Sequence, residues 1–128
     1  MAMPIFGTLK GTGTLDGSFA FAGDSNSWEV NGKYNNRELA CAKFAAPSRD
    51  TFLGLKKINA AFDAKPVCSA YFLTDAEVPS LVNTDLANVE VSVTGGEKDY
   101  SSKFSLGVFR GRLALLNRTP GGMVLYVR

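Results

Sequence analysis

Two glycine-containing dipeptides divide the first third of the chain into short apolar segments. Asp16-Gly17 lies between residues 8–15 and 18–22, and Asn31-Gly32 directly follows residues 28–30. Both dipeptides suit the positive φ angles that the central residues of a two-residue hairpin turn adopt. The first third is therefore expected to form β-hairpins.

The last third repeats this pattern. Residues 94–97, Thr-Gly-Gly-Glu, follow the alternating residues 89–93, and residues 119–122, Thr-Pro-Gly-Gly, separate the apolar runs 113–116 and 123–127. Proline and glycine at these places favour turns between strands. Hairpins are therefore expected here too.

The centre of the chain holds the best helix candidate, residues 49–63. Ser48 can cap its first turn, and Phe52 and Phe62 belong to a set of apolar residues at helical spacing. Gly54 opposes the helix by about 1 kcal/mol. We therefore expect one central helix at about residues 49–63, with strands before and after it.

These elements predict a single mainly β domain that spans residues 1–128, with an α+β arrangement as the alternative. Antiparallel, hairpin-rich strands would form a sheet, a barrel or a sandwich with the central helix. Pro79 is expected to open a short helical turn that ends near Leu86. An oligonucleotide-binding barrel also places a helix between its strands, but this chain has too many expected strands, so we assign no family.

Composition indicates where the protein resides. The chain is 45% hydrophobic and 20% charged, and no stretch approaches the roughly 20 apolar residues that span a bilayer. Its first residues lack the basic head and apolar run of a signal peptide. We therefore expect a cytoplasmic protein without a membrane partner, or a virion-associated one if it is viral. Cys41 and Cys68 are expected to be free thiols.

The sequence contains no histidine and only two cysteines. This excludes histidine-based nucleophilic systems, histidine general bases and four-cysteine zinc sites. The glycines at positions 11, 13 and 17 do not match the spacing of a dinucleotide-binding loop. Carboxylates are expected at turns and on exposed faces, so we predict no enzyme activity, no catalytic residues, no metal and no cofactor.

Positive charge is concentrated near the end of the sequence. Residues 100–128 contain no acidic residue and five basic ones, whereas residues 1–99 contain nine Lys or Arg against twelve Asp or Glu. Aromatic residues lie among the cations of this last segment. The mixture is typical of surfaces that bind single-stranded nucleic acid, because cations contact phosphates while rings stack on bases.

Alternation in this segment predicts where two of the arginines lie. Apolar residues occupy even positions up to Val108 and odd positions from Phe109, which predicts a bulge or strand break near Gly107. Beyond it, Arg110 and Arg112 would stand together on one polar strand face, where guanidinium groups suit bidentate contacts with phosphates. The alternative interpretation is that these charges keep an edge strand from pairing with other molecules.

Two functions from different classes remain. The first is a non-catalytic β-domain that binds single-stranded DNA or RNA through a short basic and aromatic sheet face. The second is a self-assembling structural protein, such as a viral coat or decoration subunit. A homo-oligomer is expected, and Tyr34 and Trp28 are the expected base-stacking residues. The full set of expected nucleic-acid contacts is Arg110, Arg112, Lys103, Lys33, Tyr34, Arg37 and Trp28.

Overall fold

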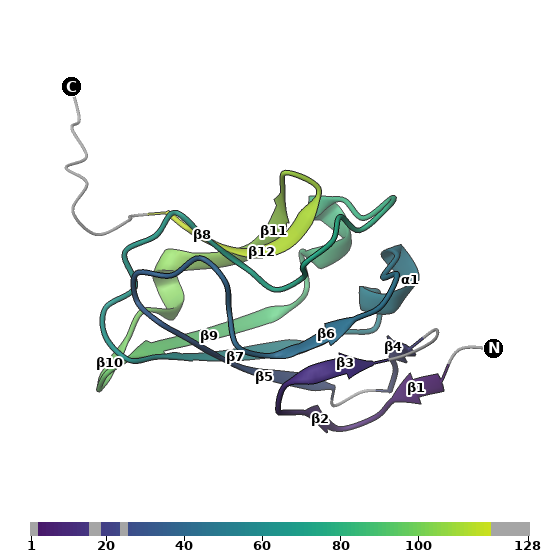
Figure 1. Cartoon of the computed structure of the whole chain (residues 1–128), viewed down its shortest axis with the longest axis horizontal. Coiled ribbons are helices and arrows are strands. Elements are labelled where there is room, and N and C mark those ends of the chain that lie inside the picture. Colours follow the sequence, from purple (N-terminus) through teal and green to yellow (C-terminus); the bar gives the residue numbers. More distant parts are fainter. Residues whose placement is uncertain (1–2, 16–18, 24–25, 119–128) are drawn as a thin grey trace.

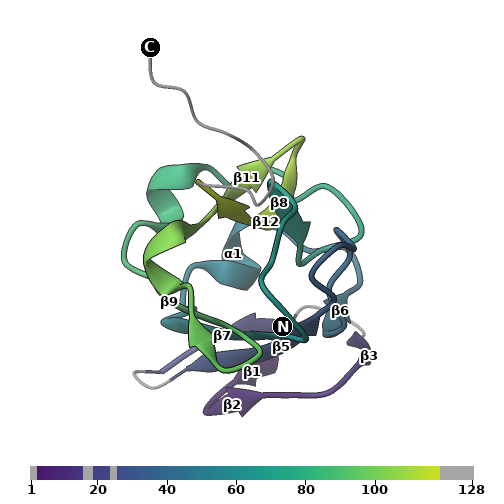
Figure 2. The ribbon, with the colours of Figure 1, turned by 90° about the vertical axis from the view of Figure 1, so that its left-hand side faces the viewer.

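A computed structural model describes residues 3–15, 19–23 and 26–118, with the backbone alone for residues 3 and 4. Within these residues the fold is mainly β, as the sequence predicts, and its strands form one five-stranded, one three-stranded and two two-stranded sheets. The two larger sheets lie one above the other, with a short helix between them at one end (Figures 1 and 2).

The five-stranded sheet is built mainly from parallel strands. Its order is β10-β9-β7-β5-β2, and only the pairing of β10 with β9 is antiparallel. The strands are β2 (Thr8–Leu9), β5 (Ser27–Gly32), β7 (Lys57–Phe62), β9 (Glu90–Gly95) and β10 (Lys98–Asp99). The carboxyl ends of β5, β7 and β9 meet at one end of the sheet, where their last residues pair in one row.

The three-stranded sheet is antiparallel, in the order β11-β12-β8. Its strands are β8 (Ala70–Phe72), β11 (Phe104–Phe109) and β12 (Arg112–Asn117). Arg110 and Gly111 form the two-residue turn between β11 and β12, with φ angles of 53° and 78°. Both angles lie in the left-handed region that such a turn requires.

Shorter elements complete the fold. Two parallel pairs join β1 (Met3–Ile5) to β4 (Phe19–Phe21) and β3 (Gly13–Leu15) to β6 (Ala42–Phe44). The helical elements are α1 (Arg49–Phe52) and the 3-10 turns η1 (Asn83–Leu86) and η2 (Ser101–Lys103). The turn η1 ends at Leu86, as expected, but it begins at Asn83, so the expectation that Pro79 opens it is wrong.

The core between the two larger sheets contains two groups of aromatic side chains. The group near α1 has ring centroids 5.3–6.3 Å apart and consists of Phe21, Trp28, Phe44 and Phe52. The group at the carboxyl end of β7 has centroids 4.6–6.3 Å apart and consists of Phe62, Tyr71 and Phe104. Each end of the molecule is therefore supported by its own aromatic group, whose burial is a large apolar contribution to stability.

The parallel strands alternate between a buried apolar face and an outward polar face. Trp28, Ile58 and Val93 are fully buried, whereas every outward residue of β5, β7 and β9 is half-buried or exposed. Alternation of this kind is typical of a sheet that is covered on one face, although parallel sheets usually carry a cover on both. The described residues thus leave one face of this sheet open.

The expected central helix is much shorter than predicted. It begins at Arg49 after Ser48, as expected, but ends at Phe52, and Lys57–Phe62 is strand β7. Gly54 follows the end of the helix and packs against β4, where a Cβ built on it would lie 2.1 Å from the carbonyl oxygen of Phe21. A larger residue could not approach β4 this closely without a shift of the backbone.

Two of the expected hairpins are absent from the described residues, and one is confirmed. Asn31-Gly32 is no turn, because it ends strand β5. Strands β3 and β4, on either side of the dipeptide Asp16-Gly17, do not pair with each other; each pairs in parallel with another strand. The turn between β9 and β10 forms at the expected place, with Gly96 at a φ of 63°. The expected turn at 119–122 lies outside the described residues.

Candidate nucleic-acid interface

The carboxyl ends of the parallel strands bring three loops together at one end of the molecule. Residues 33–37 follow β5, residues 63–69 follow β7, and residues 96 and 97 follow β9. Because the last residues of these strands pair in one row, the loops leave the sheet side by side. Figure 1 shows this end beside the turn into β10.

The start of β11 and the end of β12 reach the same place. Phe104 pairs with Asn117, and the backbone N–H of Arg118 donates to the carbonyl of Lys103 at 2.8 Å. The N–H of Asn117 donates to the carbonyl of Ser69 at 2.9 Å, which joins this segment to the loop after β7. We call the region the strand-end surface and define it by Tyr34 and nine charged residues: Lys33, Arg37, Asp63, Lys65, Glu97, Lys98, Asp99, Lys103 and Arg118.

The loop after β5 is held in place mainly through the backbone of Tyr34. Its N–H donates to the Asp63 carboxylate at 2.8 Å, and its carbonyl accepts from the N–H of Val67 at 3.0 Å and from the Tyr71 hydroxyl. Burial raises the pKa of the Tyr71 hydroxyl, so the group stays protonated and can donate. The backbone is therefore fixed while Tyr34 as a residue stays 40% exposed.

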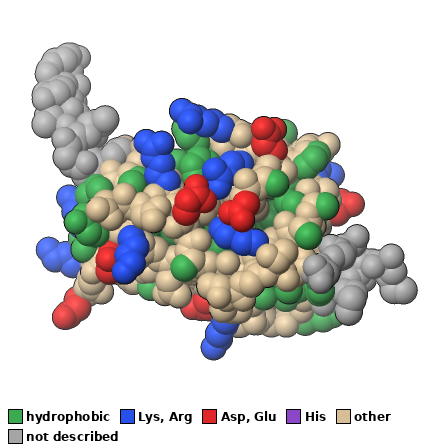
Figure 3. Space-filling view, viewed as in Figure 1, with side chains coloured by type: hydrophobic (Ala, Val, Ile, Leu, Met, Phe, Trp, Pro, Cys, Tyr) green, Lys and Arg blue, Asp and Glu red, His purple; other side chains and the backbone are tan. Residues whose placement is uncertain are grey.

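The strand-end surface carries the excess positive charge of the described residues. It holds six cations against three carboxylates, whereas the rest of the described chain holds seven of each. Lys and Arg side chains project from this end in Figure 3, which shows the molecule as in Figure 1. The potential around this end is therefore positive, although the whole chain has a net charge of only +2.

Most of these cations have no carboxylate partner. Lys33 lies 3.9 Å from Asp63, and the Arg118 guanidinium donates to the carbonyl of Ser102. Within the described ranges, the four other cations of the surface make no ion pair; these are Arg37, Lys65, Lys98 and Lys103. They are exposed and can contact an anion without first losing a partner.

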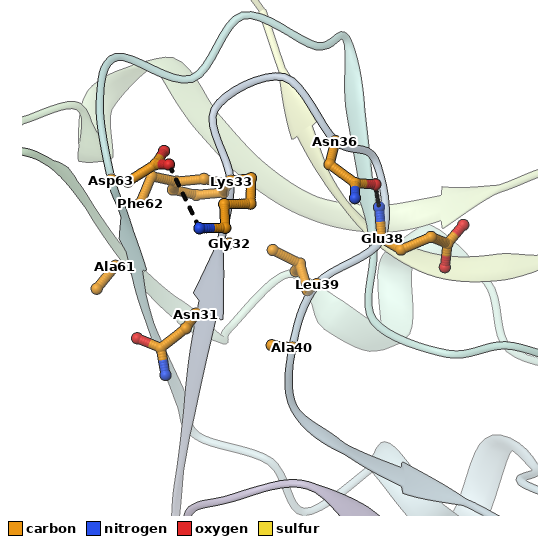
Figure 4. Close-up of a pocket in the computed structure, with 10 residues that line it drawn as sticks. All are labelled: Asn31, Gly32, Lys33, Asn36, Glu38, Leu39, Ala40, Ala61, Phe62 and Asp63. Carbon is orange, nitrogen blue, oxygen red and sulfur yellow. Dashed lines mark hydrogen bonds and ion pairs between the residues drawn. The ribbon is translucent and has the colours of Figure 1, made fainter.

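An open groove of about 540 Å³ borders this surface (Figure 4). Leu39, Ala40, Ala61 and Phe62 give it an apolar lining. Its polar residues are Asn31, Lys33, Asn36, Glu38 and Asp63. In Figure 4 the Lys33 side chain extends across the groove toward its ion-pair partner Asp63, whereas the carboxylate of Glu38 points away from it.

Four of the residues expected from the sequence belong to the strand-end surface, namely Lys33, Tyr34, Arg37 and Lys103. Trp28 does not, because β5 directs its side chain into the core, where it is fully buried and its ring stacks on Phe52 with centroids 6.0 Å apart. The expectation that Trp28 stacks on bases is wrong for this structure.

The break expected near Gly107 is wrong, and Arg110 does not lie on a strand face with Arg112. β11 continues through Gly107 without a bulge, and the apolar positions switch because Arg110 and Gly111 form a turn. Arg110 lies over the Phe109 ring, with Cζ 5.2 Å from the ring centroid. Both arginines lie at the opposite end of the hairpin from Asn117, about 17 Å away along β12.

Arg112 has a structural role. Its Cζ lies 3.8 Å from the centroid of the Phe72 ring, and its guanidinium donates to Glu38 at 2.9 Å and to the carbonyl of Thr74 at 2.8 Å. These contacts join β12 to β8 and to the segment that follows the β5 loop. Two of the five N–H donors of this guanidinium are thus directed to partners within the protein.

Sequence reasoning missed Lys65, Lys98 and Arg118 as members of one surface. Each lies a short distance after the end of a strand, but this becomes informative only when β5, β7 and β9 are known to be parallel. In antiparallel hairpins, successive strand ends lie at opposite ends of the sheet. The one signal in the sequence was a cation shortly after the ends of β5, β7, β9 and β12.

Other kinds of site are not seen in the described part of the chain. There, no three metal-ligating side chains gather, and both Cys41 and Cys68 are free. Burial raises the pKa of the Cys41 thiol, so it stays protonated. In the same ranges no helix is long and apolar enough to span a membrane.

Comparison with protein-family models, with curated proteins and with solved structures found no match to this chain.

Proposed function

We propose that the protein is a non-catalytic domain that binds single-stranded nucleic acid through the strand-end surface. The observation that carries this proposal is the location of the charge: the strand-end surface, which also exposes Tyr34, holds six cations against three carboxylates. Cations that follow a phosphate backbone, next to a ring that stacks on a base, are the features such surfaces combine.

The four unpaired cations strengthen the proposal. Arg37, Lys65, Lys98 and Lys103 are exposed, and each can neutralise a phosphate without the cost of breaking an internal ion pair. Binding would release the counterions that those phosphates hold, and this release is the main favourable contribution to such complexes. The affinity should therefore depend steeply on salt.

A salt titration tests the proposal. Binding of fluorescent DNA and RNA oligonucleotides, followed by anisotropy between about 50 and 200 mM salt, should give a slope of log K against log salt of about −3, since each contacted phosphate of a single strand contributes about −0.7. No complex with either oligonucleotide at the lowest salt, or an affinity independent of salt, would overturn the proposal.

A second function, a self-assembling structural subunit, is favoured by a different observation. The outward face of the parallel strands is covered by no layer of the described residues, although parallel sheets are usually covered on both faces. Other subunits would supply the missing cover. Light scattering after size-exclusion chromatography separates the two: large particles formed without nucleic acid favour assembly, and a monomer that binds oligonucleotide excludes it as the main function.

A further inference from the structure

We propose that the groove bordered by Asn31 and Lys33 takes up one unstacked base of the bound strand. This inference rests on the proposed function and adds a base-binding site to it. At about 540 Å³, the groove lies within the range of roughly 300–1,000 Å³ that is typical of sites for small organic groups. A nucleobase is a flat group of this kind, with an apolar face and a polar edge.

The lining of the groove fits the two parts of a base. Ala40 and Ala61 are exposed and give the groove its accessible apolar surface, while the other two apolar lining residues, Leu39 and Phe62, are almost fully buried, at 4% and 5% exposed. A base face can lie on such a surface and lose contact with water. A single strand allows this because its bases can be turned out of the stack.

The amide of Asn31 is placed to read the base edge. Asn31 is the last residue but one of β5 and is exposed. Its side chain makes no hydrogen bond within the described residues. Its backbone is fixed by two hydrogen bonds with Ala40, at 3.0 and 2.7 Å. An amide offers one acceptor and two donors, which match the paired donor and acceptor on a base edge.

Lys33 connects the groove with the phosphate contacts. Its ion pair with Asp63 is long, at 3.9 Å, and its side chain is 72% exposed, so a phosphate can replace the carboxylate at little cost. Lys33 follows Asn31 by two residues on the same segment. A nucleotide whose phosphate contacts Lys33 therefore has its base next to the groove.

The test compares two strands with identical phosphates, a ten-nucleotide oligodeoxyadenylate and a strand of ten abasic sites. Wild-type protein should bind the base-bearing strand at least about fivefold more tightly. Ala61→Leu, which narrows the groove, and Asn31→Ala, which removes the amide, should each lower this preference at least about twofold while affinity for the abasic strand stays the same.

Matched controls make the test specific. Ala87→Leu and Asn88→Ala make the same changes at exposed positions away from the groove and should keep the wild-type preference. An unchanged preference in both groove variants, or equal binding of the two strands by wild-type protein, overturns the base site and leaves the proposed function intact. If wild-type protein binds neither strand at low salt, the proposed function itself fails.

Discussion

The two ends of the molecule use their cations in different ways. Near α1, the Arg49 guanidinium donates twice to the Asp85 carboxylate, at 3.1 Å each, and the carboxylate also accepts from the N–H of Val82. At the strand-end surface, Lys65, Lys98 and Lys103 have no such partner among the described residues. A cation that forms an ion pair with a carboxylate joins two segments of the chain. A cation without such a partner stays available to a ligand.

The same contrast applies to the aromatic residues. Trp28 and Phe52 stack inside the core near α1, whereas the Tyr34 ring at the other end remains partly exposed above a backbone fixed by Asp63 and Tyr71. Changes at the first end should therefore affect stability, and changes at the second should affect binding.

Trp28→Ala should have the largest effect, a loss of about 3–5 kcal/mol in the free energy of unfolding, because it leaves a cavity in the most buried part of the core. Urea denaturation followed by circular dichroism measures it. If the loss were below about 1 kcal/mol and oligonucleotide binding fell sharply, Trp28 would be a ligand contact after all.

Arg112→Ala should lower the free energy of unfolding by about 1–3 kcal/mol. The change removes the contact with the Phe72 ring and the hydrogen bonds to Glu38 and to the carbonyl of Thr74, some of which are partly buried. The matched change Lys103→Ala, at an exposed cation without an ion pair, should stay within about 0.5 kcal/mol. If chemical denaturation gave the same loss in the free energy of unfolding for both variants, paired and unpaired cations would not differ in their contribution to stability.

Tyr34→Ala should weaken oligonucleotide binding about fivefold or more, because one stacking contact is lost, and should change the free energy of unfolding by less than about 0.5 kcal/mol. Phe6→Ala is the control, since Phe6 is an even more exposed ring outside the strand-end surface. Anisotropy titrations at one salt concentration compare the two. A larger loss of affinity for Phe6→Ala would place the binding surface elsewhere.

Asp85→Asn should have the smallest effect, visible in the pH dependence of stability. The Arg49 guanidinium lowers the pKa of the Asp85 carboxyl, so this pair contributes stability above the unfolded-state pKa of about 3.9 and loses it as the pH falls through the lower folded-state pKa. Thermal unfolding should therefore show a smaller loss of stability below about pH 4 in the variant than in wild-type protein. Identical acid profiles would show that the pair contributes nothing.

Local signals in the sequence predicted some elements well. The start of the helix at Arg49 and the turn at Gly96 depend on neighbouring residues, and both are present. The turn expected at Asn31-Gly32 did not form, because Gly32 serves close packing instead. A Cβ there would lie 2.5 Å from the Phe62 ring. Residues 57–62 carry both a helical and an alternating apolar pattern, and burial of Ile58 and Ala60 against the core selects the strand.

The candidate surface was only partly predictable for a related reason. Lys33, Tyr34 and Arg37 are neighbours in sequence, so their joint exposure follows from one loop. Lys65 and Lys98 join them only through the parallel pairing of β7 with β5 and β9, which is a property of distant segments. Arg110 and Arg112 were misplaced because alternation alone does not separate a bulge from a two-residue turn.

Two triple variants of equal charge test whether the strand-end surface is the binding surface. Lys65→Ala with Lys98→Ala and Lys103→Ala removes three free cations from the strand-end surface. Lys10→Ala with Lys56→Ala and Arg110→Ala removes three exposed cations that also lack an ion pair within the described residues but lie elsewhere.

At about 100 mM salt, anisotropy with a single-stranded oligonucleotide should show a loss of at least tenfold for the first variant, and a change within about twofold for the second. Equal losses in the two variants would mean that net charge alone drives binding, and a larger loss in the second would move the site away from the strand-end surface. Either result would contradict binding through the strand-end surface.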